Sequence, residues 1–252
     1  MSKSNGYIHS IETMSTLDGP GVRTVVFLQG CNMFCRYCHN IDTNKRGLGT
    51  VYEANKLCAE ILRNREYWGK EGGVTFTGGE PLCQSEFLLE ILKILKQESV
   101  NIVIDTNLNA EFETDIEPLI HYVDLWMISL KHIDANVHRE LTGVGNELIL
   151  NNFRLLDSEL NVLNRNKTTC KKQFRIRYVV IPNITNTKQV VLATKKFIAG
   201  LSNVESVELL PYSRIGRHKW IEIYGKYDFE EVREPAKEEM DEIRELIYYD
   251  ID

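Results

Sequence analysis

The sequence lacks the features that mark nucleic-acid-binding and membrane proteins. It has no excess of positive charge, because 30 lysines and arginines stand against 36 aspartates and glutamates, giving a net charge of −6. It also lacks an uninterrupted apolar stretch approaching the roughly 18 residues that cross a bilayer, and its first residues lack the apolar core of a secretory signal. We therefore expect a cytoplasmic, monomeric protein that binds neither nucleic acid nor membrane.

A disulfide framework is also missing. Three of the six cysteines fall within the segment 31–38, and in a reducing compartment such clustering favours a metal site over disulfides. The other three, Cys58, Cys83 and Cys170, are scattered and cannot form a second cluster by local spacing. The sequence thus predicts a single metal site.

Linkers, internal repeats and low-complexity tracts are absent as well, so we expect a single domain over residues 1–252. Short apolar runs alternate with segments of helical period, which is typical of parallel strands joined by helical crossovers. The expected strands are Val22–Leu28, Val74–Phe76, Ile102–Asp105, Leu125–Leu130, Phe174–Ile181 and Val207–Leu210.

The expected helices lie between and after these strands. Two have a clear apolar face, one around Leu57 and one around Leu88, and the others are Asn146–Leu163, Thr187–Ala199 and a carboxy-terminal helix at about 238–248. The polar stretch Asn161–Lys172 is expected to be a surface loop. Six β/α units with right-handed crossovers predict an α/β fold, a partial (β/α)6 TIM-like barrel whose chemistry lies at the carboxyl ends of the strands.

The clustered cysteines follow the first of these strands, in the loop 30–39. Cys31, Cys35 and Cys38 form the pattern C-x3-C-x2-C, which lets one loop place three thiolates around a cubane cluster. Because an ordinary [4Fe–4S] site has four cysteine ligands, three would leave one iron open to a substrate. The alternative is a structural zinc site made by the same cysteines with His39, although such sites usually join two separated pairs of ligands.

This segment resembles the signature of the radical S-adenosylmethionine (SAM) superfamily, C-x3-C-x-aromatic-C, with Tyr37 as the aromatic residue. The resemblance implies a [4Fe–4S] cluster whose open iron binds the amino and carboxylate groups of SAM. An injected electron would then break the sulfonium bond and give a 5′-deoxyadenosyl radical. Tyr37 would contact the adenine, and the glycine-rich strand end Gly78-Gly79-Glu80 would approach the methionine amino group.

Within that superfamily the chain resembles the activating enzymes of glycyl-radical enzymes, and most closely those of pyruvate formate-lyase. The similar segments run nearly end to end and include Asp18-Gly19-Pro20-Gly21-Val22-Arg23, Tyr37-Cys38-His39-Asn40, Asp105-Thr106-Asn107, Arg177-Tyr178-Val179-Val180, Leu209-Leu210-Pro211-Tyr212 and His218-Lys219-Trp220. Activating enzymes of other glycyl-radical systems commonly carry an inserted ferredoxin-like module, and no such insert is present here.

The resemblance also implies residue roles. Asp18 and Arg177 would lie near the glycine loop of the partner, although Asp18 could instead form a turn with Gly19 and Arg177 could pair with an acidic neighbour. The residues expected to bind the cofactor are Tyr37, His39, Gly78, Gly79, Glu80, Asp105, Asn107, Ser129, Leu130, Lys131 and Ser213.

Three positions depart from the family pattern. Ser129 replaces an aspartate associated with SAM and a monovalent cation, so a cation requirement is in doubt; Ser213 replaces a histidine, and Leu108 replaces a glycine. The resemblance implies hydrogen abstraction from a backbone glycine of a partner such as pyruvate formate-lyase (formate C-acetyltransferase), with flavodoxin or ferredoxin as electron donor. The alternatives are a different glycyl-radical enzyme, a small-molecule substrate, or a zinc or electron-transfer protein.

Overall fold

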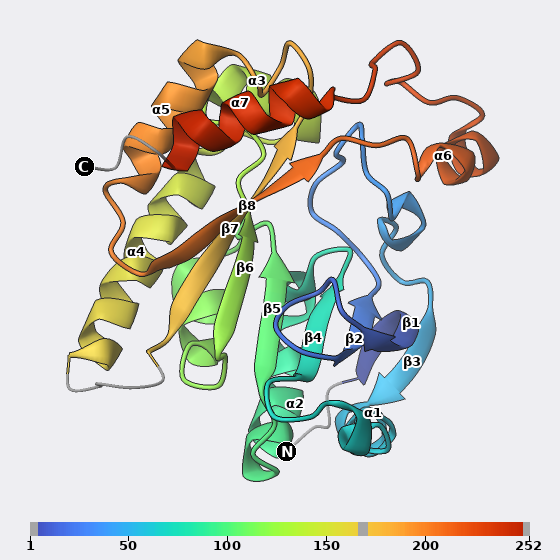
Figure 1. The fold of residues 1–252 in the computed structure, drawn as a ribbon. Coiled ribbons are helices and arrows are strands. Elements are labelled where there is room, and N and C mark those ends of the chain that lie inside the picture. Colours follow the sequence, from blue (N-terminus) through green and yellow to red (C-terminus); the bar gives the residue numbers. More distant parts are fainter. Residues whose placement is uncertain (1–4, 166–170, 249–252) are drawn as a thin grey trace.

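The computed structural model describes residues 5–165 and 171–248, and one eight-stranded sheet dominates it (Figure 1). The strand order is β3-β1-β2-β4-β5-β6-β7-β8, and the six strands from β2 to β8 are parallel. The strands are β1 Asn5–Ser15, β2 Arg23–Leu28, β3 Thr50–Glu53, β4 Gly73–Gly78, β5 Ile102–Thr106, β6 Leu125–Ser129, β7 Gln173–Val180 and β8 Val204–Pro211.

The helices alternate with the strands along the chain. They are α1 Ala54–Leu62, α2 Ser85–Gln97, α3 Ala135–Thr142, α4 Glu147–Asn164, α5 Lys188–Ile198, α6 Arg217–Tyr224 and α7 Lys237–Tyr248. Short helical turns are η1 Ile41–Thr43, η2 Arg65–Tyr67, η3 Pro81–Gln84, η4 Phe112–Ile116 and η5 Glu117–Leu119. Among the helices in the described ranges, none combines the length and hydropathy needed to cross a membrane.

All six predicted parallel strands are present, which confirms the α/β fold with its largely parallel sheet. The prediction missed β1 and β3, which pair antiparallel at one edge, because β1 is mostly exposed and shows no sustained apolar run. It also missed α3 and α6. For α3 the signals were readable, because Asp134 caps its first turn and Gly143 ends it in the left-handed conformation.

The predicted surface loop Asn161–Lys172 was wrong at its start, because α4 continues to Asn164. The Asn164 side chain is buried and donates to the Lys172 carbonyl oxygen at 2.8 Å, so helix and following strand are tied together. Residues 166–170 of that prediction, with Cys170, lie outside the described residues.

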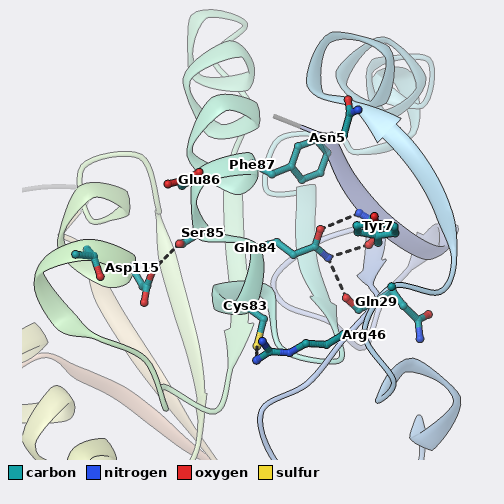
Figure 2. A pocket seen from close by; sticks show the side chains of 12 residues that line it. Asn5, Tyr7, Gln29, Arg46, Cys83, Gln84, Ser85, Glu86, Phe87 and Asp115 are labelled. Carbon is teal, nitrogen blue, oxygen red and sulfur yellow. Dashed lines mark hydrogen bonds between the residues drawn. The ribbon is translucent and has the colours of Figure 1, made fainter. Parts of the chain in front are cut away.

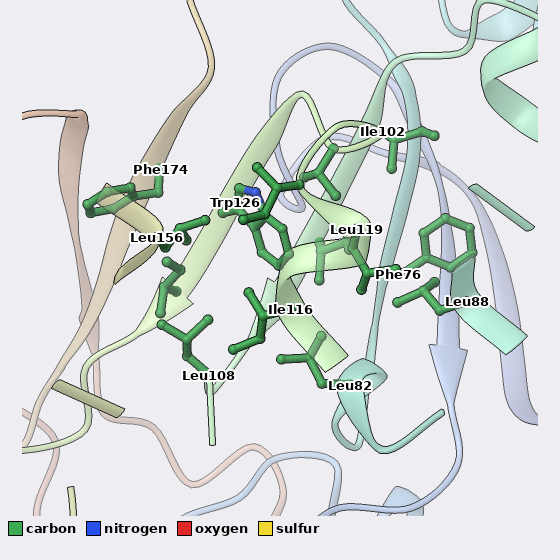
Figure 3. Close-up of a cluster of buried hydrophobic side chains, with 14 of the residues drawn as sticks. Phe76, Leu82, Leu88, Ile102, Leu108, Ile116, Leu119, Trp126, Leu156 and Phe174 are labelled. Atoms are coloured by element: carbon green, nitrogen blue, oxygen red, sulfur yellow. The ribbon is translucent and has the colours of Figure 1, made fainter. Parts of the chain in front are cut away.

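The main core lies between the helices and one face of the sheet (Figure 3). Alternate strand residues such as Phe76, Trp126 and Phe174 pack there against Leu88 of α2 and Leu156 of α4. Burying each of these large side chains contributes roughly 1.5–3 kcal/mol. The opposite face carries a small apolar cluster of Val103, Leu125 and Met127, and above it polar side chains. This second face is where the predicted site residues gather.

Candidate active site

The cysteine loop follows β2 and is held by backbone hydrogen bonds to the segment after it. The Gly30 amide donates to the Thr43 carbonyl at 2.7 Å, and the Cys31 amide donates to the Asn44 carbonyl at 2.9 Å. Gly30 has a φ of +103°, a conformation that favours glycine. The loop is therefore preformed on one side by its own continuation.

Two helices that the sequence did not predict hold the other side of the loop. At the end of α3 the Thr142 carbonyl accepts from the Phe34 amide at 2.7 Å. From α6 the Trp220 indole donates to the Cys38 carbonyl at 2.9 Å, and its ring meets Phe34 edge-on with centroids 5.2 Å apart. In the sequence, Trp220 belongs to a segment similar to the activating enzymes, but that similarity does not show which residue Trp220 contacts.

The three cysteines of the loop are free thiols that burial keeps protonated in the absence of metal. Burial raises the pKa of Cys38 to about 12 and raises those of Cys31 and Cys35, while the Lys131 ammonium acts in the opposite direction on Cys35 and Cys38. Because a metal binds thiolates, loading must release protons here. A half-buried set of three thiols with a nearby cation fits an iron–sulfur cluster, whose iron charge replaces those protons.

The zinc alternative would need His39 as the fourth ligand. Its exposed ring instead lies with Nε2 3.0 Å from the Ser213 carbonyl oxygen. Over the described ranges, no three His, Cys, Asp or Glu side chains converge closely enough to hold one metal ion. In a cubane site each cysteine binds a different iron, so convergence on a single point is not required there. The Ser213 hydroxyl accepts from the Ile215 amide at 3.2 Å, so both Ser213 oxygens have partners within the protein.

Tyr37 fits the role of a ligand-contacting side chain. It is 5% exposed, and its hydroxyl has no hydrogen-bond partner among the described residues. The Lys131 ammonium lies 5.9 Å from the centroid of its ring, and the Phe229 ring packs at 5.9 Å. A buried phenol without a partner is costly, so this hydroxyl is suited to pairing with a bound molecule. The chain thus offers a cation and an unpaired hydroxyl beside the cluster loop.

The glycines after β4 are required by the neighbouring strand. A Cβ at Gly78, whose φ is +112°, would lie 2.4 Å from the Leu28 amide nitrogen, and one at Gly79 would lie 2.1 Å from the Gly30 oxygen. The sequence analysis explained these glycines by close approach to the methionine amino group. The geometry shows that packing of the strand end against the cysteine loop already requires both.

Glu80 is a buried carboxylate that ties the strand ends together. It is 1% exposed and accepts from the Thr106 hydroxyl at 2.6 Å, the Asn107 amide at 2.7 Å and the Leu82 amide at 3.0 Å. Burial raises the pKa of Glu80 to about 7 in spite of these hydrogen bonds. Its carboxylate therefore fixes the end of β5 next to the cysteine loop at an energetic cost.

This cost makes stability depend on pH. Because the folded-state pKa of Glu80 is about 7 against 4.5 unperturbed, its contribution to stability is present below about pH 4.5 and lost as the pH rises to about 7. Denaturant unfolding of cluster-free protein should show Glu80→Gln losing roughly 3 kcal/mol of this pH dependence. Parallel pH profiles for the wild type and the variant would contradict the assignment.

Asn107 and Leu108 follow β5. The Asn107 side-chain Nδ2 donates to the Asn32 side-chain oxygen at 3.1 Å and lies 3.9 Å from the Cys31 sulfur. Leu108, where the family pattern has glycine, is fully buried yet has a φ of +60°. Its carbonyl oxygen accepts from the Asn152 side chain at 3.0 Å, which stabilises the left-handed conformation. The chain keeps the glycine geometry and fills the adjoining core with a leucine.

Leu108→Gly is expected to destabilise the protein although it removes backbone strain. The strain is worth about 1–2 kcal/mol, whereas deleting a buried leucine side chain costs about 3–5 kcal/mol. Chemical denaturation should therefore show a net loss of about 2 kcal/mol. Asn183→Gly is the matched control, because Asn183 has a φ of +62° but is exposed. A more stable Leu108→Gly variant would show that the side chain contributes little.

Arg177 joins two carboxylates on the polar face of the sheet. Its Nη1 lies 2.7 Å from Asp105 Oδ2, and its Nε lies 3.0 Å from Glu208 Oε2. The Thr77 hydroxyl also donates to Asp105 Oδ2, at 3.0 Å. These carboxylates, Asp105 above all, raise the pKa of Arg177 despite its burial. The acidic neighbour left open by the sequence analysis is thus present, and it is a residue expected to bind the cofactor.

Ser129 and Leu130 lie next to this network. Ser129 is paired with Arg177 in the ladder between β6 and β7, and the Leu130 amide donates to the Arg177 carbonyl at 3.0 Å. The Leu130 side chain is buried. The position that carries aspartate in the family pattern is therefore beside a guanidinium that already pairs with Asp105.

Asp18 lies in the loop between β1 and β2. Its carboxylate accepts from the Ser15 hydroxyl at 2.5 Å, and its charge contributes to raising the pKa of Arg177. Asp18 therefore takes part in a local turn, and its charge also acts on Arg177. The expected residues are gathered at the cysteine loop and the neighbouring strand ends. Thr77, Thr106 and Glu208 also belong to these networks and were missed.

Cys83 adjoins Glu80, whose carbonyl oxygen accepts from the Cys83 amide at 3.1 Å, and it lines a pocket of about 450 Å³ on the side of α2 (Figure 2). The Arg46 guanidinium donates to its sulfur at 3.3 Å, and Gln84 bonds the backbone of Tyr7 and Gln29. None of the residues predicted for the active site lines this pocket. Cys83, which the sequence left outside the cluster motif, thus has the Arg46 guanidinium as its polar neighbour.

A largely parallel sheet with one three-cysteine loop at the carboxyl end of a strand indicates a one-cluster iron–sulfur enzyme, and comparisons with known proteins agree. Residues 17–150 match the family described as a 4Fe-4S single cluster domain. The chain is 36% identical over 244 residues to the pyruvate formate-lyase-activating enzyme of Listeria monocytogenes, covering 94% of each chain. It is 34% identical over 244 residues to the pyruvate formate-lyase 1-activating enzyme of Escherichia coli, covering 96% of this chain and 95% of the relative.

Solved structures show the same fold. A domain of a pyruvate formate-lyase-activating enzyme from Bacteroides vulgatus matches with a TM-score of 0.56 at 29% identity, covering 70% of this chain and 92% of that one. A radical SAM methyltransferase from Sphaerobacter thermophilus matches with a TM-score of 0.61 at 16% identity, covering 90% of this chain and 64% of that one. The chain belongs to the pyruvate formate-lyase-activating enzyme family of radical SAM enzymes.

Proposed function

We propose that this protein installs a glycyl radical on a partner enzyme, with pyruvate formate-lyase as the first candidate. Cys31, Cys35 and Cys38 hold the [4Fe–4S] cluster, and SAM binds beside Lys131 and the buried Tyr37, whose hydroxyl has no partner among the described residues. When bound, the reduced cluster supplies the electron that cleaves SAM and leaves a 5′-deoxyadenosyl radical. The enzyme acts as a cytoplasmic monomer, with flavodoxin or ferredoxin as donor, because the cluster must work near the low end of its range of potentials.

The observation that carries this proposal is the juxtaposition of the cysteine loop with a charged network on the same face of the sheet. Arg177 and Asp105 pair at 2.7 Å, and Asp18 lies close enough to influence the Arg177 pKa. Fixed charges of both signs can bind the polar backbone of an extended peptide and exclude water from it. A glycine inserted between this network and the cysteine loop would lie within reach of the radical.

The network also bears on the monovalent cation. Because Arg177 already balances Asp105, SAM binding should be equal in sodium, potassium and choline chloride at one ionic strength. Ser129→Asp would add a third carboxylate beside Arg177, whose guanidinium already pairs with Asp105 and Glu208. The variant should bind SAM about tenfold more weakly in choline chloride, and sodium or potassium should restore its affinity for SAM. Isothermal titration with the reconstituted protein measures this. A cation requirement in the wild type would contradict the account.

The proposal is tested by mixing reconstituted, reduced enzyme and SAM with candidate glycyl-radical enzymes. Electron paramagnetic resonance should show a glycyl doublet with pyruvate formate-lyase. A doublet only with another glycyl-radical enzyme would reassign the partner. Deoxyadenosine formed without any protein radical, across all candidates, would reject a protein substrate and favour a small molecule.

A further inference from the structure

Arg23 is a buried cation beneath the proposed active site. It is the first residue of β2, at the end of the sheet opposite the cysteine loop, and its side chain is 0% exposed. Burial lowers the pKa of Arg23 to about 10, so it stays charged at neutral pH. A buried charge is costly unless hydrogen bonds compensate it, so its surroundings are built for it.

All five N–H donors of Arg23 are used. Nε donates at 2.7 Å to a hydroxyl, Nη1 donates to two backbone oxygens, and Nη2 donates to two backbone oxygens and a side-chain amide oxygen. The acceptors are Thr75 Oγ1, the carbonyl oxygens of Pro20, Glu71, Val74 and Asn101, and Asn101 Oδ1. A lysine has three donors and could not satisfy this set.

One of these contacts leads directly to Asp18. Thr75 Oγ1 accepts from Arg23 and donates to the Asp18 carbonyl oxygen at 2.6 Å. The loop also rests on Arg23, because a Cβ added at Gly19 would lie 3.1 Å from Arg23 Cδ. Thr75 and Arg23 thus hold the Asp18 backbone in place, and the Asp18 carboxylate remains available to interact with Ser15 and Arg177.

We propose that Arg23, acting through the Thr75 hydroxyl, is a positioning residue that holds the Asp18 loop in place for the partner's glycine segment. The inference rests on the proposed function for the identity of that segment. A preformed loop loses less conformational entropy when a partner binds. The two hydrogen bonds that link Arg23 through Thr75 to Asp18, here called the relay, are therefore expected to lower the KM for the protein substrate. The relay makes no contact with the cysteine loop, so cleavage of SAM without a partner should not depend on it.

The test uses three threonine variants of the full chain with reconstituted cluster. Thr75→Val removes the relay hydroxyl, and Thr75→Ser retains it. Thr24→Val is the matched control, because Thr24 is a fully buried threonine at the same end of the sheet whose hydroxyl accepts from the Trp68 indole at 3.0 Å instead of bonding the Asp18 backbone. The readouts are amide hydrogen exchange in the segment 15–22, the KM for the glycyl-radical enzyme, and SAM cleavage without partner.

Thr75→Val should raise amide exchange in the segment 15–22 and the KM for the protein substrate, each about tenfold, with uncoupled SAM cleavage unchanged. Thr75→Ser should match the wild type, and Thr24→Val should alter thermal stability only. Unchanged loop exchange in Thr75→Val, or the same change in Thr24→Val, would overturn the inference. If the wild type forms no protein radical, the proposed function fails, and loop exchange alone still decides whether the relay positions the loop.

Discussion

Cys35→Ala is expected to leave the protein without its cluster and to abolish SAM cleavage, by at least about a thousandfold. Two cysteines cannot hold a cubane cluster from one loop, and no further cysteine among the described residues lies in that loop. Anaerobic reconstitution should give about four irons per wild-type chain and none that is stably bound in the variant. Cleavage is measured as 5′-deoxyadenosine.

Cys58→Ala is the control for this prediction. Cys58 lies in α1, is 1% exposed and points its sulfur toward the Ile91 carbonyl oxygen at 3.8 Å. The variant should lose some stability and retain full iron content and cleavage. Turnover by Cys35→Ala, or one zinc and no cluster in the wild type, would remove the assignment of the cysteine loop.

Arg177→Met is expected to lower glycyl-radical formation about a hundredfold, with a smaller loss of SAM cleavage without partner because Asp105 loses its counter-charge. Removing the guanidinium leaves Asp105 and Glu208 without their shared cation, and a hundredfold loss corresponds to about 2.8 kcal/mol. The radical is quantified by electron paramagnetic resonance, and cleavage is measured in the same samples.

Arg175→Met provides the matched control for Arg177. Arg175 lies two residues earlier on the same strand and pairs with Glu205 at 2.8 Å at a more exposed position. It should retain radical formation within about twofold, because a partly exposed pair contributes little. Equal losses in the two variants would indicate general damage to β7 rather than a role in substrate binding.

The sequence predicted the parallel strands because each contains a short apolar run. It could not predict β1 or β3, since both strands are mostly exposed and lack such a run. It also placed the cysteine loop correctly after β2. Helices α3 and α6 hold that loop through contacts between residues more than 100 positions apart in the chain. Local sequence patterns do not predict such contacts.

In the candidate site, too, the sequence identified residues but not their contacts. Asp105 and Arg177 were both singled out from the sequence, but only the fold shows that they pair with each other across three neighbouring strands. Gly78 and Gly79 were predicted to bind the cofactor, and the geometry adds a packing reason for their small size, the close approach of β2 and the cysteine loop. The residue types in the sequence predicted which segments form the site. The register of the strands determines which side chains pair with each other there.

Leu108, Ser129 and Ser213 depart from the family pattern without disrupting the arrangement around them. Leu108 keeps a left-handed backbone, Ser129 adjoins a guanidinium, and the Ser213 carbonyl engages His39. These differences leave the cysteine loop unchanged and alter the rim of the site. They are the positions at which we expect this chain to differ from its relatives in cofactor binding.

The most direct test of the account follows the abstracted hydrogen. A partner glycyl-radical enzyme labelled with deuterium at the α-carbon of its glycines is mixed with reduced enzyme and SAM, and the 5′-deoxyadenosine is analysed by mass spectrometry. The account predicts that deuterium enters the deoxyadenosine as the glycyl radical forms. Deoxyadenosine without deuterium, in the presence of the labelled partner, would contradict it.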